Sequence, residues 1–151
     1  MQKIVPCLWY KGNAEEAVEF YLSVFPDSKK LGVSRYPTEG LADFQKEFAG
    51  KPLTIDFELF GQRYTALNAG DEFTFNEAIS LMVMCKDQAE IDYYWEKLAA
   101  DGGEESVCGW LKDKYGLAWQ VTPEDFDNKI INDPKAFKNM MKMKKIIIAD
   151  L

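Results

Sequence analysis

One pattern of apolar and polar residues occurs twice in this chain, 75 positions apart. Residues 4–10 form a short apolar run and residues 13–21 have the spacing of an amphipathic helix; the same succession returns at 79–85 and 88–95. An apolar run followed by helical periodicity is typical of a strand and then a helix. Two copies at one offset therefore predict two βα-led modules of the same kind, with a place for a ligand between them.

Each copy continues into three further strand candidates, so both halves have the predicted order βαβββ. The first half has an expected strand at 4–10, a helix capped by Asn13, a strand at 30–36, an irregular stretch at 37–52 in which Phe44 and Phe48 favour a short helix, and a hairpin of strands at 53–60 and 63–68. The second half has an expected strand at 79–85, a helix to about residue 100 capped by Asp87, and short strands at 107–110, 111–114 and 117–121.

Two helical segments are expected after the second copy. Thr122-Pro123 and Asp133-Pro134 each place a proline directly after a capping residue, which is a common start of a helix. The apolar end of the chain, with its methionines and Ile146 to Ile148, is typical of packing or of a dimer contact. We therefore expect a single domain with module one at about 1–72, module two at about 73–123 and a helical tail at about 124–151.

Composition excludes several classes of partner. The 151 residues carry a formal net charge of −7, and a nucleic-acid or anionic-membrane surface would need the opposite sign. No apolar run approaches the roughly 20 residues of a membrane span. The first residues enter a strand-like segment without a signal-peptide core, so a cytoplasmic location is expected.

The three cysteines do not form a recognisable framework. Cys7, Cys85 and Cys108 are odd in number and lack CxxC spacing, which argues against disulfides and against a zinc site. We expect them to be buried, reduced thiols. A nucleophilic Cys108 would normally need a histidine partner, and the chain has no histidine.

Three stretches carry a family resemblance: residues 12–17 with Phe20-Tyr21, residues 66–70, and above all residues 108–121, CGWLKDKYGLAWQV. They resemble the PhnB-like branch of the vicinal oxygen chelate (glyoxalase/bleomycin-resistance/dioxygenase) superfamily, whose members are often labelled 3-demethylubiquinone-9 3-methyltransferase-like. The resemblance covers nearly the whole chain. It implies an α+β fold in which two paired βαβββ modules form a cupped mixed sheet around a cavity, with C-terminal helices added, and it implies a homodimer.

Members of this superfamily usually bind a divalent metal through four inward side chains. The resemblance places those positions on Pro6, Asn68, Leu81 and Gln120. Two of these side chains cannot ligate, and neutral amides are weak ligands for a transition metal. We therefore expect no metal and no other cofactor. Asn68 and Gln120 are expected to offer hydrogen bonds to a ligand instead, or else to satisfy backbone groups at a strand end.

Aromatic residues supply the other candidate ligand contacts. Strand alternation puts Pro6, Leu8 and Tyr10 on one face, so that if Pro6 faces the cavity Trp9 packs under the helix. The same alternation puts Gln120 inside the cavity and Trp119 outside. The predicted ligand-binding aromatic residues are Tyr10, Tyr64, Phe73 and Phe75, of which the last two lie in the linker and are candidates for a lid.

The hypothesis that follows is a metal-free protein that binds a small organic molecule. An alternative is an enzyme, an isomerase, lyase or methyltransferase-like transferase, acting on a small aromatic or apolar substrate through Asp56, Glu58 or Asp113, with or without a divalent metal. Asp56 and Glu58 could equally be the solvated side of a strand, and Asp113 a surface ion pair. No glycine-rich loop opens a helix, so methyl transfer is not inferred. A third interpretation is a dimeric interaction module that uses the apolar tail.

Overall fold

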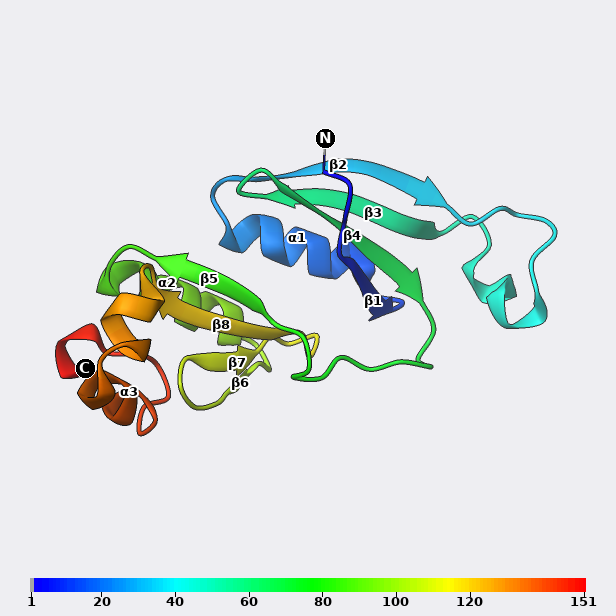
Figure 1. The fold of residues 1–151 in the computed structure, drawn as a ribbon. Coiled ribbons are helices and arrows are strands. Elements are labelled where there is room, and N and C mark those ends of the chain that lie inside the picture. Colours follow the sequence, from blue (N-terminus) through cyan, green and yellow to red (C-terminus); the bar gives the residue numbers. More distant parts are fainter. Residues whose placement is uncertain (1) are drawn as a thin grey trace. The chain divides into compact units, whose positions relative to one another are not determined.

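The computed structural model describes residues 2–151, which form two compact units, residues 2–74 and Phe75–Leu151 (Figure 1). Each unit contains one four-stranded mixed sheet and one long helix. The strand orders, β1-β4-β3-β2 and β5-β8-β7-β6, are equivalent, and in each sheet the first and last strands of the unit pair in parallel. The βαβββ repeat predicted from the sequence is therefore confirmed in both halves.

In the first unit, one face of the sheet is packed against α1. The helix buries Ala14, Ala17, Val18 and Tyr21, and the strands bury the alternate residues that face it. These side chains between the helix and the sheet form most of the core of the unit. Full burial of each large apolar side chain contributes about 1.5–3 kcal/mol. The elements are β1 (Cys7–Lys11), α1 (Ala14–Val24), β2 (Ser28–Arg35), β3 (Pro52–Leu59) and β4 (Gln62–Ala69).

The alternation of β1 is the reverse of the one expected. Tyr10 is fully buried and its hydroxyl is 2.9 Å from that of Tyr21 on α1. Trp9, expected beneath the helix, lies on the opposite side, where it contacts Phe73 and the carbonyl of Gly70. The reason is pairing with β4, whose own alternation puts Ala66 against the helix and directly beside Leu8.

The start of α1 is fixed by a residue 54 positions away. Asn13 makes no side-chain hydrogen bond to the helix that it precedes. The Oδ1 atom of Asn68 on β4 accepts the hydrogen bond from the Ala14 amide at 3.2 Å, while its Nδ2 donates to the Pro52 carbonyl at 3.0 Å. One buried amide thus joins the helix to two strands and satisfies a backbone donor at the helix start.

Residues 37–52 form an ordered excursion between β2 and β3. The expected short helix is present as the 3-10 helix η1 (Asp43–Phe48). The excursion is closed at its base by Tyr36, whose amide donates to the Lys51 carbonyl and whose carbonyl accepts from Gly50. The Tyr36 ring stacks on Phe48, 5.2 Å between centroids. These contacts hold the excursion beside the ends of β1 and β4.

The second unit repeats this plan with shorter outer strands. Asp87 caps α2 as predicted, by accepting from the Glu90 amide. The strand expected at 107–110 is wrong, because Cys108 and Gly109 have left-handed backbone angles and form a turn. The elements are β5 (Leu81–Cys85), α2 (Gln88–Ala99), β6 (Glu104–Glu105), β7 (Trp110–Lys112) and β8 (Ala118–Pro123).

The C-terminal segment packs on its own unit. Thr122 and Pro123 belong to β8 instead of starting a helix, and a π-helix, η2 (Asp127–Ile131), follows. Asp133 caps α3 (Pro134–Met140) as predicted, and a last 3-10 helix is η3 (Ile148–Asp150). No helix among residues 2–151 is both long enough and apolar enough to cross a membrane.

The tail has a small core of its own. Ile130, Met140 and Ile146 are buried together, with Cys108 packed against them. The backbone of the tail also accepts hydrogen bonds from the amides of Cys108 and Gly109, both 2.8 Å long. The apolar character of this segment therefore serves packing within the second unit.

We expect Ile146→Ala to lower the free energy of unfolding by about 2–4 kcal/mol, because it leaves a cavity in this buried cluster. Ile131→Ala is the matched control, since Ile131 is 45% exposed and should cost well under half as much. Urea unfolding followed by circular dichroism measures both. Equal effects of the two substitutions would contradict the assignment of the tail to the core.

Asn68→Ala should lower the free energy of unfolding by about 2–3 kcal/mol, because it leaves the Ala14 amide and the Pro52 carbonyl without their partner. Asn76→Ala is the control. The Asn76 side chain accepts one described hydrogen bond, an exposed one from the Ala78 backbone N–H, so this substitution should lower the free energy of unfolding by only about 0.5 kcal/mol or less. The measurement is the same urea titration. A fully stable Asn68→Ala protein would show that the amide is free for another role.

Candidate functional site

The face of the first sheet that points away from α1 is called here the open face. It is formed by the side chains of Cys7 and Trp9 on β1 and of Thr65 and Leu67 on β4, which are paired across the parallel strands. Asp56 on β3 pairs with Thr65 and continues the same face. All five side chains are partly or largely exposed, whereas their neighbours in sequence on the helix side, such as Leu8 and Ala66, are buried.

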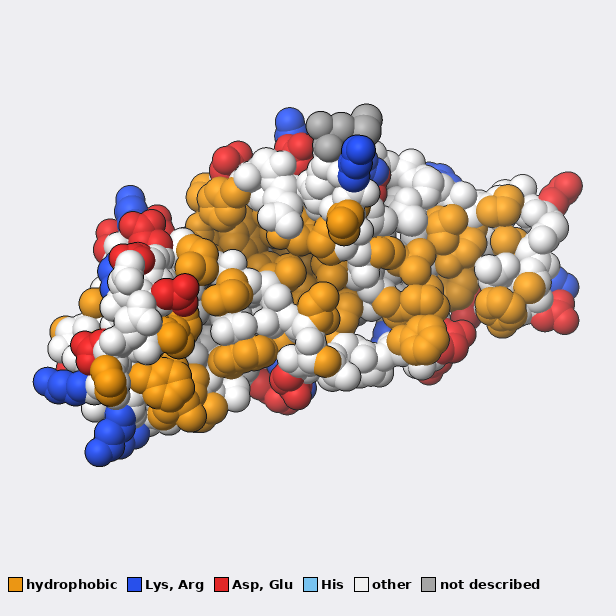
Figure 2. Space-filling view, in the orientation of Figure 1, with side chains coloured by type: hydrophobic (Ala, Val, Ile, Leu, Met, Phe, Trp, Pro, Cys, Tyr) orange, Lys and Arg blue, Asp and Glu red, His pale blue; other side chains and the backbone are white. Residues whose placement is uncertain are grey.

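A cavity of about 430 Å³ lies where the open face meets the 37–52 excursion, and it is called the loop cavity below. Trp9 and Leu67 line it from the sheet, and Phe44 and Phe48 line it from η1. The space-filling view shows hydrophobic side chains gathered on the side of the first unit where this excursion lies (Figure 2). The remaining residues that line the loop cavity are Tyr36, Pro37, Gly40, Leu41, Gln45, Leu53, Ala69, Gly70 and Glu72.

The rings of the loop cavity are held in place by specific contacts. The indole Nε1 of Trp9 donates to the Gly70 carbonyl at 2.9 Å. The Trp9 and Phe73 rings form a T-shaped pair with 4.8 Å between their centroids. The Tyr36 hydroxyl donates to the Asn68 carbonyl at 2.8 Å. Burial, and secondly the negative charge of Glu72, raises the pKa of Tyr36, so this hydroxyl stays protonated and keeps its role as a donor.

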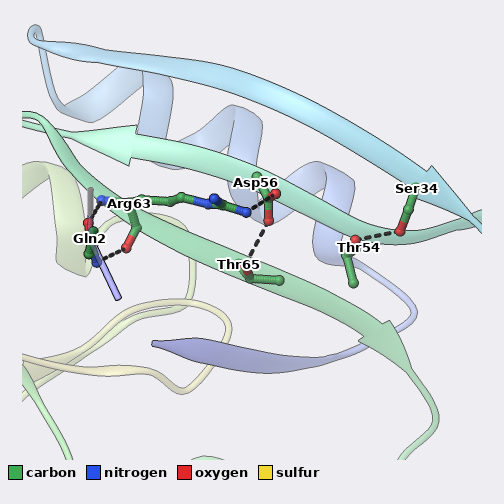
Figure 3. Close-up of polar contacts among 6 residues, drawn as sticks. All are labelled: Gln2, Ser34, Thr54, Asp56, Arg63 and Thr65. Atoms are coloured by element: carbon green, nitrogen blue, oxygen red, sulfur yellow. Dashed lines mark hydrogen bonds and ion pairs between the residues drawn. The ribbon is translucent and has the colours of Figure 1, made fainter. Parts of the chain in front are cut away.

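A strip of polar side chains occupies the other part of the open face (Figure 3). Asp56 accepts hydrogen bonds from Arg63 at 2.6 Å and from Thr65 at 2.7 Å. Glu58 forms an ion pair with Lys29 at 3.5 Å. Both carboxylates thus have cationic partners on half-exposed strands, an arrangement that fits the solvated side of a sheet and does not set up an acid/base pair.

Three of the predicted ligand-binding residues lie on the helix side of the first sheet. Tyr10 and Asn68 are engaged with Tyr21 and with the backbone, as described above, and Tyr64 stacks on Phe57. Burial raises the pKa of Tyr64 above its usual range. Their contact with a ligand stays a prediction and is not part of the site proposed below.

Gln120 lies on the face of the second sheet that α2 leaves uncovered. It pairs in register with Met82 and Trp110, and its Nε2 donates to the Ser80 hydroxyl at 2.9 Å. Trp119 points to the other side and is buried, so this part of the predicted alternation is confirmed. Leu81 lies on the same side as Trp119, its partner in the register.

The two linker phenylalanines are placed differently. Phe73 is 63% exposed and belongs to the first unit through its contact with Trp9. Phe75 opens the second unit and is partly buried. A lid role for either residue remains a prediction.

Asp113 is a buried structural residue, and the expectation of a surface ion pair is wrong. Its carboxylate accepts hydrogen bonds from the amides of Tyr115 and Leu117 and from the indole of Trp119 at 2.9 Å. This arrangement organises the turn between β7 and β8.

The cysteines differ in burial, which corrects the expectation of three buried thiols. Cys85 is buried, Cys108 is half-buried and Cys7 is exposed on the open face. Burial raises the pKa of Cys85 to about 12. The thiol of Cys7 is partly desolvated although the residue is exposed, and this, together with the charge of Asp56, raises its pKa. Neither thiol is activated toward nucleophilic chemistry, because only the thiolate reacts.

The side chains present do not fit a divalent metal of the superfamily type. Across the paired first and last strands of each unit, the faces free of a helix present Cys7 beside Thr65 and Met82 beside Gln120. Within residues 2–151, no three or more His, Cys, Asp or Glu side chains are grouped as a metal site. Thioether, hydroxyl and amide groups are poor substitutes for imidazole and carboxylate.

The predicted site missed Trp9, Leu67 and the rings of η1. A signal for the correct alternation was present in the hairpin: Arg63 and Thr65 are polar, as are Asp56 and Glu58, so the residues between them had to be the buried side. That assignment carries Tyr64 and Asn68 to the helix side. The approach of η1 to Trp9 has no comparable signal in the sequence.

Comparisons with known proteins agree with this architecture. The model of the family described as 3-demethylubiquinone-9 3-methyltransferase matches residues 2–122. A PhnB protein from Bacillus cereus, described as a putative 3-demethylubiquinone-9 3-methyltransferase, is 36% identical, with a TM-score of 0.69 over 81% of this chain and 99% of that chain. No curated protein matches the chain.

Two further solved structures share the fold at lower identity. Protein PA1353 from Pseudomonas aeruginosa is 19% identical, with a TM-score of 0.62 over 82% of this chain and 98% of that one. The fosfomycin resistance protein FosX from Listeria monocytogenes, solved with Mn(II) and sulfate, is 13% identical, with a TM-score of 0.56 over 84% and 94%. The chain therefore belongs to the 3-demethylubiquinone-9 3-methyltransferase family, the PhnB-like branch of the vicinal oxygen chelate superfamily.

Proposed function

We propose that this protein binds a small, largely apolar or aromatic organic molecule in the loop cavity, without a metal ion. The observation that carries the proposal is the cavity itself, whose volume of about 430 Å³ is lined by the rings of Trp9, Tyr36, Phe44 and Phe48. Pockets for small ligands are usually concave, predominantly apolar and of about 300–1,000 Å³. The loop cavity has these properties within one unit.

The anchoring of the walls supports a preformed site. Trp9 is fixed by its hydrogen bond to Gly70, and Tyr36 is fixed by its hydroxyl and by its stacking on Phe48. A ligand would therefore meet rings that are already oriented, which lowers the entropic cost of binding. A planar molecule that inserts beside Trp9 and over Leu67 is the best match to these surfaces.

The binding function is preferred to catalysis for a chemical reason. The carboxylates proposed for an enzyme are neutralised by Arg63 and Lys29 or buried in a turn, and the thiols of Cys7 and Cys85 have raised pKa values. The methyltransferase wording in the family description belongs to the family, and this chain lacks a glycine-rich loop that opens a helix for a nucleotide-like methyl donor. A homodimer and a cytoplasmic location stay predictions.

Leu67→Trp should remove binding by filling the loop cavity, with a loss of affinity of about tenfold or more. Neutral one-ring and two-ring aromatic fragments are titrated while the indole N–H signal of Trp9 is followed by NMR, and Trp9→Phe identifies that signal. Leu31→Trp is the control, because Leu31 lies on β2, is 43% exposed and does not line the cavity.

The same titration is repeated with EDTA and with added Mn²⁺. Unchanged affinities are the expected result. Fragments that bind only with metal present, or that shift every indole signal except that of Trp9, would contradict the proposed function.

A further inference from the structure

We propose that the ligand of the loop cavity carries a positive charge, in the form of an organic ammonium group held among aromatic rings and beside Glu72. This inference rests on the proposed function, because it concerns the same cavity, and it goes further by naming the chemical class of the ligand. It follows from the charge of the lining, the position of one carboxylate and the density of rings around it.

The lining of the loop cavity has one formal charge. Glu72 is a carboxylate, and no lysine or arginine is among the described residues that line the cavity. The carboxylates on the open face have cationic partners, since Asp56 pairs with Arg63 and Glu58 pairs with Lys29. Glu72 takes part in none of the ion pairs found among residues 2–151. The cavity therefore combines an apolar interior with an uncompensated negative charge.

The Glu72 carboxylate lies against the wall that holds Trp9. A Cβ atom built on Gly70 would come within 2.5 Å of Oε2 of Glu72, so the carboxyl group lies directly over the Gly70 backbone. The carbonyl of the same Gly70 anchors the Trp9 indole. The carboxylate and the indole thus both lie against Gly70, and both residues line the cavity.

The charge of Glu72 also reaches Tyr36, another residue of the lining. It contributes to the raised pKa of Tyr36, whose ring stacks on Phe48. An ammonium group in the cavity would lie among aromatic side chains and beside the Glu72 carboxylate, since all of these residues line it. Aromatic rings attract cations, and they do so most strongly in partly desolvated sites.

The opposite charge would be disfavoured at this place. An anionic ligand would lose its hydration against apolar walls and would meet Glu72 without a compensating cation. A neutral ligand would gain only the apolar contacts. The cationic class is therefore the one that uses every feature of the lining, and a methylated ammonium is the member that suits rings best, because its methyl groups spread the charge over an apolar surface.

Two probes of nearly equal shape test the inference. They are choline and 3,3-dimethylbutan-1-ol, which replaces the quaternary nitrogen by carbon and removes the charge. Both are titrated at one low ionic strength, where screening is small, with the Trp9 indole N–H as the readout. Choline should bind about tenfold more tightly than the alcohol.

Two substitutions separate charge from shape. Glu72→Gln should weaken choline by about three- to tenfold and leave the alcohol unchanged, whereas Glu47→Gln, in the same excursion but outside the cavity lining, should alter neither. Phe48→Leu should reduce the preference for choline while retaining an apolar wall. Phe137→Leu, on the second unit, is its control.

The outcomes distinguish this inference from the function on which it rests. If the alcohol or the neutral aromatic fragments bind as tightly as choline does in this titration, the ammonium assignment is overturned and the apolar binding function stands. If Glu72→Gln and Glu47→Gln weaken choline equally, the effect is one of net charge and the assignment also fails. If no probe of either class shifts Trp9, both the inference and the proposed function are wrong.

Discussion

Each unit of this protein depends on one helix packing against one face of one small sheet. In the first unit α1 covers a face built from alternate residues of β1, β3 and β4, and the buried amide of Asn68 ties the helix start to two strands. Because side chains alternate along a strand, this single packing decides which residues are left for the opposite face. The candidate site is a consequence of that division, since Trp9 and Leu67 are open only because Tyr10 and Ala66 are buried.

The repeat has been retained as architecture while its two copies have diverged in their free faces. The first unit presents a polar strip and, beside it, an aromatic cavity closed by residues 37–52. The second presents Met82, Met84 and Trp110 around Gln120, and its turn after β7 is organised by buried Asp113. Strand order and helix packing tolerate such change, because the core lies on the other side of each sheet. Family membership therefore fixes the scaffold, and the free faces have to be read residue by residue.

The lining of the loop cavity shows how a site can rest on structural residues. Tyr36 closes the excursion by backbone pairing, and its ring also lines the cavity. The carbonyl of Gly70, the residue that follows β4, anchors the indole of Trp9. Such dual use links the stability of the unit to the shape of the cavity.

Local patterns were enough to predict the two βαβββ modules and the caps at Asp87 and Asp133, because periodicity, capping and turn chemistry are local properties. The family was predicted from the resemblance of three short stretches. The face of Tyr64 and Asn68 was indicated only by the polar residues of the hairpin, and that of Tyr10 had no signal in its own strand, so an alternation assumed one residue out of step exchanged the two faces. The capping of α1 by Asn68, the burial of Asp113 and the approach of η1 to Trp9 were decided only in the tertiary structure. These contacts join residues distant along the chain, and their geometry follows from strand register and packing, which no local pattern encodes.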